Sequence, residues 1–285
     1  MMNSTAGFDV RAEYTKLITV FYATVDSKRG TKLPASDKWL FDAETLAVKL
    51  YYHLASVFHL SFGTGVPGRE DHKNTFFDHA SINVLARAAL ETYLTFFFIY
   101  CDSNAGIEER RFRHSVWKLS TPTDRQGFNV VSEVALQALA VEKQYMEKML
   151  REIEETPVFL AMNETLRKKA RKGEWRLGKG WADLAEIAGF AKQTFRPVYS
   201  YLCSYAHTGG LSGVQIGQAI TKADQKGLSN VSLHLGLLLM SHFLFSYTDL
   251  FPETRSVLEV DEEGYALANK WLITWKDEGF KKTFS

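Results

Sequence analysis

Polar residues recur at every fourth position in an otherwise apolar stretch of the chain, where a helix places them on one face. They are His79, Asn83, Arg87, Glu91 and Thr95. Arg87 and Glu91 can form an i,i+4 ion pair, but burying such a pair contributes little stability because its desolvation cost can match the Coulombic gain. Two interpretations follow: a structural ion pair that also binds a neighbouring loop, or a functional arginine that faces a cleft and is oriented by Glu91.

A second cluster of reactive side chains lies in the segment RPVYSYLCSYAHTGGLSG, which predicts a helix that ends at His207 before two glycines. A protonated imidazole is favoured at a helix C-terminus, and imidazole titrates near physiological pH. His207 is therefore a candidate general acid or base. The alternative is that it caps the helix or forms a hydrogen bond inward to Glu91.

A third segment combines positive charge with aromatic rings. Seven of the thirteen residues 167–179 are basic, and tryptophans lie within and just after them. Basic side chains can neutralise phosphates while an aromatic ring stacks on a base. The predicted nucleic-acid-binding residues are Lys168, Lys169, Arg171, Lys172, Trp175 and Arg176. The alternative is a solvated loop between helices.

Composition excludes several classes of protein. With 46% hydrophobic residues, 24% charged residues and a net charge of +1, the 285-residue chain is neither disordered nor a strongly basic nucleic-acid wrapper. Two cysteines cannot form a disulfide framework or a four-cysteine metal site. The common phosphate-loop, dinucleotide, zinc-protease and serine-hydrolase motifs are absent from the sequence, so we expect no metal and no cofactor. Without an export signal in the sequence, a cytoplasmic location is expected.

The apolar periodicity predicts an all-α fold, a single domain over 1–285 with about eight or nine helices. Segments 1–40 and 252–285 are possible helical extensions at the two ends. The expected helices span residues 9–27, 42–58, 78–101, 108–119, 132–155, 181–189, 190–206, 228–251 and 261–276. The helix over 132–155 is expected to pack through a stripe formed by Val134, Ala138, Val141, Tyr145, Met149 and Ile153.

The segment from Gly227 to Thr248 contains no charged residue. Its interspersed polar residues favour a buried helix or a subunit interface over a membrane span. A narrow polar stripe of His242, Ser246 and Asp249 could form hydrogen bonds across a two-fold axis, so a homodimer is expected, with this helix as one candidate seam.

Three segments together resemble a known pattern: NVLARAALETYLTFFFIY, WADLAEIAGF and YSYLCSYAHTGG. They resemble a family of bacterial all-helical proteins of unassigned function that is related to the HEPN superfamily of helical RNases and nucleotide-binding proteins. In that family an Arg-x3-Glu lies on a central helix, a Trp opens a short helix, and a Tyr/Ser-rich helix ends in His. The resemblance spans roughly residues 40–245. It implies action on RNA or nucleotides, as a metal-independent ribonuclease in bacterial stress or phage defence.

HEPN ribonucleases carry Arg and His on one helix, separated by four to six residues, and no arginine precedes a histidine at that spacing here. A catalytic site must therefore be assembled across helices, with His207 as general acid or base, Arg87 stabilising the phosphorane and Glu91 positioning either of them. The rival hypothesis is a non-catalytic helical module that binds a protein partner or dimerises. A separation of Arg87 and His207 within about 6 Å at an open cleft would favour catalysis, whereas the same pair sealed inside the core would favour the structural interpretation.

Overall fold

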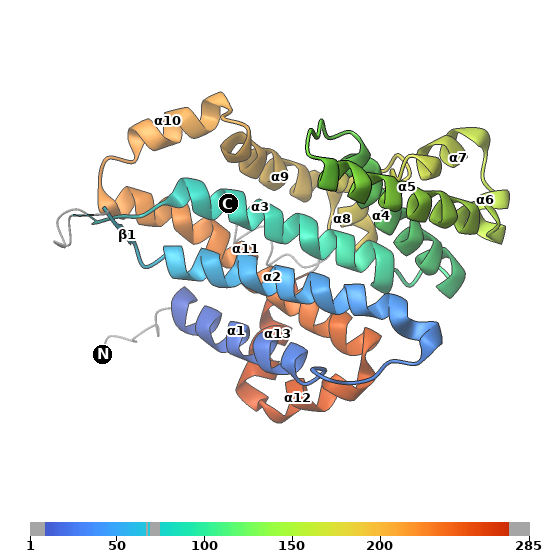
Figure 1. Cartoon of the computed structure of the whole chain (residues 1–285). Helices are drawn as coiled ribbons and strands as arrows, with labels where there is room; N and C mark the ends of the chain where they lie inside the picture. Colours follow the sequence, from blue (N-terminus) through green and yellow to red (C-terminus); the bar gives the residue numbers. More distant parts are fainter. Residues whose placement is uncertain (1–8, 67, 69–74, 274–285) are drawn as a thin grey trace, which may run out of the picture. The chain divides into compact units, whose positions relative to one another are not determined.

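The computed structural model describes residues 9–66, 68 and 75–273 (Figure 1). The described residues are mainly helical, which confirms the predicted all-α class. Within them the strands are β1 (Thr64–Gly65) and β2 (Thr75–Phe76), which pair antiparallel. The helices are α1 (Val10–Asp26), η1 (Ala35–Leu40), α2 (Phe41–Leu60), α3 (His79–Phe96), η3 (Phe97–Cys101), α4 (Ile107–Gln126), α5 (Glu133–Glu154), α6 (Pro157–Leu160), α7 (Glu164–Arg171), α8 (Trp181–Ile187), α9 (Lys192–Ala206), α10 (Gly210–Gln218), α11 (Lys222–Leu250), η4 (Pro252–Thr254), α12 (Arg255–Val260) and α13 (Glu262–Trp271).

The described residues form thirteen α-helices, more than predicted, because short helices such as α6, α7, α10 and α12 escape a periodicity search. The start of α11 also differs from the prediction near residue 228. Thr221 and Asp224 form a reciprocal capping box that begins the helix at Lys222.

The chain divides into two compact units. Unit 1 comprises Met1–Phe97 and Ala185–Ser285, and unit 2 comprises Phe98–Leu184. Unit 1 is therefore made of two separate stretches of sequence, and unit 2 lies between them in the chain.

The core of unit 1 forms where α3 packs against α2, α11 and α9. Stacked aromatic rings fill it: the ring centroid of Phe243 on α11 lies 4.5 Å from that of Phe21 and 4.9 Å from that of Phe96. A Cβ on Gly236 would lie 2.5 Å from the ring of Tyr14, so glycine allows the close approach of α11 to α1.

The segments expected as terminal extensions contribute to this core. Tyr14, Leu17 and Phe21 of α1 are fully buried. Helices α12 and α13 pack against α1, and the indole of Trp271 donates a hydrogen bond to Glu13. The helix predicted over 261–276 is described as far as Trp271, and positions 274–276 lie outside the described residues.

Helix α11 is enclosed mainly by helices of its own unit, chiefly α1, α3 and α13. The polar stripe predicted to face a second subunit forms contacts within the chain. His242 Nε2 donates to the Ile273 carbonyl at 3.0 Å, the Ser246 hydroxyl donates to the His242 carbonyl, and Asp249 pairs with Arg255. The apolar character of this helix is thus explained without a partner chain.

Two helical stretches, His79–Cys101 and Lys222–Leu250, are long and apolar enough to cross a membrane. In their most apolar windows, 61% and 72% of the residues are buried inside the molecule. Core helices of soluble proteins share this combination of length, composition and burial.

Unit 2 has its own core, formed chiefly between α4 and α5 by Phe112, Val116, Leu119, Met149, Ile153 and Phe159. The predicted stripe on α5 is right for two of its six residues. Met149 and Ile153 are buried, but Val134, Val141 and Tyr145 are 78%, 68% and 57% exposed. The face toward α4 runs instead through neighbouring positions, because Gln126 and Arg125 of α4 contact Leu139 and Glu142.

Candidate functional site

The polar stripe on α3 lies largely against α9. The amide of Asn83 donates to the Tyr201 hydroxyl at 3.4 Å and accepts from Ser232 at 2.7 Å. The Thr95 hydroxyl instead donates to the carbonyl of Glu91 on its own helix. The stripe is thus a helix–helix interface along most of its length, with Arg87 and Glu91 in its middle.

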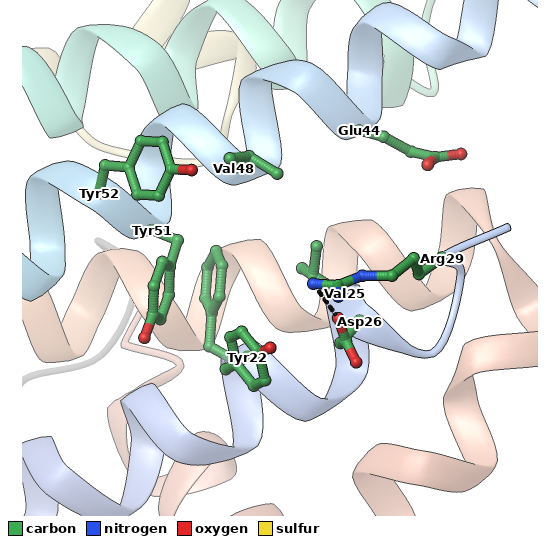
Figure 2. Close-up of a pocket in the computed structure, with 9 residues that line it drawn as sticks. Tyr22, Val25, Asp26, Arg29, Glu44, Val48, Tyr51 and Tyr52 are labelled. Carbon is green, nitrogen blue, oxygen red and sulfur yellow. Dashed lines mark ion pairs between the residues drawn. The ribbon is translucent and has the colours of Figure 1, made fainter.

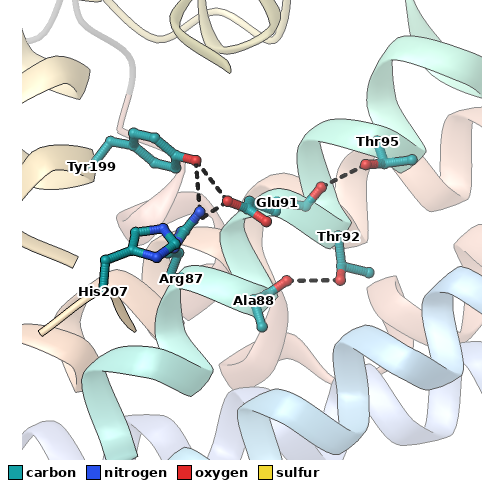
Figure 3. A network of polar contacts seen from close by, with 7 residues as sticks. All are labelled: Arg87, Ala88, Glu91, Thr92, Thr95, Tyr199 and His207. Carbon is teal, nitrogen blue, oxygen red and sulfur yellow. Dashed lines mark hydrogen bonds and ion pairs between the residues drawn. The ribbon is translucent and has the colours of Figure 1, made fainter. Parts of the chain in front are cut away.

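Arg87 is held by three side chains at once (Figure 3). Its Nε donates to Glu91 Oε1 at 2.9 Å, its Nη2 to the Tyr199 hydroxyl at 3.3 Å and its Nη1 to His207 Nε2 at 2.8 Å. The Tyr199 hydroxyl donates to the same Glu91 oxygen at 2.6 Å. Three of the five N–H donors of the guanidinium are therefore used by the described residues.

This geometry identifies the ring nitrogen of His207 that accepts the hydrogen bond. A guanidinium can only donate, so Nε2 must accept, and the proton of the neutral ring lies on Nδ1. His207 is exposed, whereas the side chains of Arg87 and Glu91 are 18% and 26% exposed. The cluster therefore lies at the protein surface and presents an imidazole with a defined tautomer.

The end of α9 positions His207. It is the C-cap residue, and the Gly209 N–H donates to the Ser204 carbonyl at 2.7 Å, the long bond of a Schellman turn. A Cβ on Gly209 would lie 2.9 Å from Ser204 Oγ and 3.2 Å from Ser204 Cα, so the turn leaves little room for a side chain there. The Ser212 hydroxyl donates to the carbonyls of Ser204 and Gly209, which fastens the turn to α10.

Thr208 has a backbone φ of +55°, a conformation that β-branched residues rarely adopt. It immediately follows His207. Strain of this kind persists only where the surrounding structure enforces it, and it is concentrated at functional sites.

The electrostatics of the cluster keep Arg87 charged and Tyr199 neutral. Partial burial disfavours the guanidinium cation, but the hydrogen bond to Tyr199 and the charge of Glu91 outweigh it and raise the pKa of Arg87. Burial, and then the hydrogen bond to Glu91, raises the pKa of Tyr199 well above its ordinary value, although Arg87 opposes this. The Tyr199 hydroxyl therefore remains a donor at neutral pH.

Arg87, Glu91 and His207 thus lie together, as the hypothesis of a site assembled across helices requires. Sequence reasoning did not assign a role to Tyr199. The available signal was its position eight residues before His207, which is about two helical turns and therefore on a similar face of α9.

The basic segment lies in unit 2, and several of its charges already have partners. Arg171 pairs with Glu154 and Glu164, and Lys169 with Glu174. The Lys168 and Lys172 side chains are exposed.

Two side chains near the end of this segment, Trp175 and Arg176, contact each other, and Trp175 also contacts the core of unit 2. The Trp175 ring lies 6.1 Å from the rings of Phe98 and Trp181, and it packs against the core cluster between α4 and α5. The guanidinium carbon of Arg176 lies 4.8 Å from the Trp181 ring centroid. Trp175 and Arg176 therefore also have structural contacts, while Lys168, Arg171 and Lys172 are the exposed members of the predicted set.

In the part of the chain that the structure describes, no group of three or more His, Cys, Asp or Glu side chains is placed to hold a metal ion. Comparisons of the chain with models of protein families, with curated proteins and with solved structures found no match. The geometry around Arg87 and His207 is therefore what supports a function.

Proposed function

We propose that the protein is a HEPN-like, metal-independent ribonuclease whose site comprises Arg87, Glu91, Tyr199 and His207. The observation that carries this proposal is the 2.8 Å contact between an exposed imidazole and a guanidinium held by a carboxylate and a phenol. A base next to a fixed cation is the arrangement that a phosphodiester requires, because proton removal and charge stabilisation occur at neighbouring atoms.

The roles follow from the hydrogen bonds. A phosphodiester oxygen accepts from the guanidinium of Arg87 and competes with His207 for its Nη1 donor. The freed Nε2 then takes the proton of a ribose 2′-hydroxyl, the 2′-oxygen attacks phosphorus, and the bond to the 5′-oxygen breaks. Water protonates the departing 5′-oxygen, because in-line attack places it opposite the base. The products are a 2′,3′-cyclic phosphate and a 5′-hydroxyl.

Glu91 and Tyr199 act as positioning residues in this scheme. Glu91 accepts from both Arg87 and Tyr199, so the guanidinium plane has a fixed orientation before substrate binds. Lys168 and Lys172 contribute affinity for the RNA backbone through their charge. Cytoplasmic action on cellular or phage RNA fits this reaction.

The test uses purified full-length protein with end-labelled RNA in the presence of a chelator. Cleavage should leave cyclic-phosphate ends, and His207→Ala and Arg87→Ala should each lower the rate by about a hundredfold or more. His59→Ala, at an exposed histidine on α2, is the matched control and should retain full activity. Absence of cleavage by the wild type, or equal activity of all variants, would refute the proposal.

A non-catalytic, self-associating module is the second candidate, and the exposed apolar side chains of α5 favour it. Val134, Val141 and Tyr145 lie at heptad-like spacing on one exposed face. Light scattering tests this candidate: a wild-type dimer that becomes monomeric in Val141→Lys would support it. A monomeric wild type would exclude it.

A further inference from the structure

A pocket of about 250 Å³ lies between α1 and α2, apart from the arginine–histidine site in sequence and chemistry (Figure 2). Its volume falls just below the roughly 300–1,000 Å³ of typical ligand pockets, which suits a small molecule. We call it the α1–α2 pocket. It is lined by Phe21, Tyr22, Val25, Asp26, Arg29, Glu44, Val48, Tyr51 and Tyr52.

One end of the pocket is aromatic. The ring centroid of Tyr51 lies 5.5 Å from that of Tyr22, 6.0 Å from that of Phe21 and 6.3 Å from that of Tyr52. The Tyr22 and Tyr52 side chains are 46% and 63% exposed, so large apolar rings face solvent there rather than the core. Rings that surround an accessible space bind apolar groups and attract cations at their faces.

The other end of the pocket is acidic. Figure 2 shows Glu44 and Asp26 away from the tyrosine rings, with valine side chains between the two ends. Glu44 precedes Tyr51 by seven residues on α2, about two turns or roughly 11 Å. Asp26 pairs with Arg29, whose side chain is 76% exposed.

Glu44 has an unmet hydrogen-bonding requirement. Its Oε1 is buried and accepts no hydrogen bond from the described residues. Lys28 and Glu253 influence it electrostatically, but they pair with each other, so neither neutralises it. With Asp26 and Arg29 also paired, the acidic end has one carboxylate in excess, and burial raises the pKa of Glu44.

We propose that the α1–α2 pocket binds a small amphipathic organic cation, an arylalkylamine, with its ring among the tyrosines and its ammonium group at Glu44. The ammonium pairs with the Glu44 carboxylate, whose charge the Lys28–Glu253 pair does not neutralise, and the ring covers the exposed faces of Tyr22 and Tyr52. A carboxylate ligand is disfavoured because it would meet the unpaired charge of Glu44. This binding activity is separate from the proposed ribonuclease.

Calorimetric titration of the full-length chain with phenylethylammonium tests the proposal, with phenylethanol as the uncharged and phenylpropionate as the anionic counterpart. The cation should bind at least about tenfold more tightly than either counterpart. Glu44→Gln, which keeps the shape but removes the charge, should weaken cation binding by about tenfold and leave phenylethanol binding unchanged.

Two further variants keep the test independent of folding. Tyr52→Ala removes a largely exposed ring and should weaken binding by about fivefold through loss of its contact with the ligand's ring. Glu147→Gln, at an exposed carboxylate on α5, should bind as the wild type does. Equal affinity for the cation and the alcohol, unchanged binding by Glu44→Gln, or no binding heat with about 10 mM phenylethylammonium would overturn the proposal.

Discussion

His207 accepts a hydrogen bond from Arg87 across 2.8 Å, although 120 residues of chain separate them. This bond exists only with a neutral ring, because an imidazolium would place two cations in contact. In the proposed ribonuclease, a phosphate oxygen that takes this Nη1–H donor releases the lone pair of His207 Nε2.

Tyr199→Phe should slow RNA cleavage while the chain still folds. The substitution removes the hydroxyl that donates to Glu91 and accepts from Arg87 but keeps the ring, which stacks on Phe195 at 5.3 Å. We expect RNA cleavage to slow by about tenfold and the free energy of unfolding to fall by about 1 kcal/mol. Kinetics and chemical denaturation measure these, with Tyr145→Phe as the exposed control. Full activity in Tyr199→Phe would contradict the assigned role.

Thr208→Gly should stabilise the protein. The positive φ of Thr208 costs a β-branched residue about 1 kcal/mol or more, and glycine adopts it without strain. We expect a net gain of about 0.5–1 kcal/mol in the free energy of unfolding. Thr208→Ala retains a Cβ and should gain less, so equal gains in both variants would argue against strain as the cause. A simultaneous loss of RNA cleavage in Thr208→Gly would indicate that the strain positions His207.

Reversing Lys168 and Lys172 should weaken RNA binding, because both are exposed while Arg171 and Lys169 have carboxylate partners. Each lost phosphate contact should flatten the dependence of log affinity on log salt by about 0.7 for single-stranded RNA. Filter binding across salt concentrations gives this slope. Lys226→Glu, an exposed reversal on α11, is the control. An unchanged slope in the double variant would identify the segment as a solvated surface.

Glu44→Gln should also alter the pH dependence of stability. Burial raises the pKa of Glu44 in the folded state, with Lys28 opposing, so the folded chain binds its proton more tightly than the unfolded chain. Stability then falls as pH rises from the ordinary value of 4.5 through the raised one. At pH 7 the variant should gain at most about 2 °C in Tm, since solvent screens part of the effect. The gain should vanish in acid, and a pH-independent gain would exclude this cause.

Periodicity predicted the all-α class and the stripe on α3, because helical spacing alone determines which residues share a face. The grouping of His207 with Arg87 and Glu91 came instead from its position at a helix end and from the HEPN-like resemblance. Periodicity could not assign Tyr199, since a tyrosine in a helix rich in tyrosines has no distinguishing signal until its partner is known. The contact depends on how α9 is oriented against α3, which is a property of tertiary packing.

The α5 stripe and the α1–α2 pocket illustrate the same limit. Val134, Val141 and Tyr145 have the spacing of a buried face, yet α4 packs one position aside and leaves them exposed. Phe21 and Val25 fit a core stripe on α1, and the sequence does not reveal that Tyr22 and Tyr52 surround a cavity beside them. The neighbouring helix determines which of two adjacent apolar faces becomes buried.

Unit 2 occupies the stretch of chain between α3 and α9, the two helices that supply Arg87 and His207. Both the arginine–histidine cluster and the α1–α2 pocket therefore consist of residues encoded outside this insert. Substitutions or changes of length within residues 98–184 therefore leave the side chains of both sites unchanged in the sequence. The surface of unit 2 can vary without a substitution at any residue of the proposed ribonuclease site or of the proposed cation pocket.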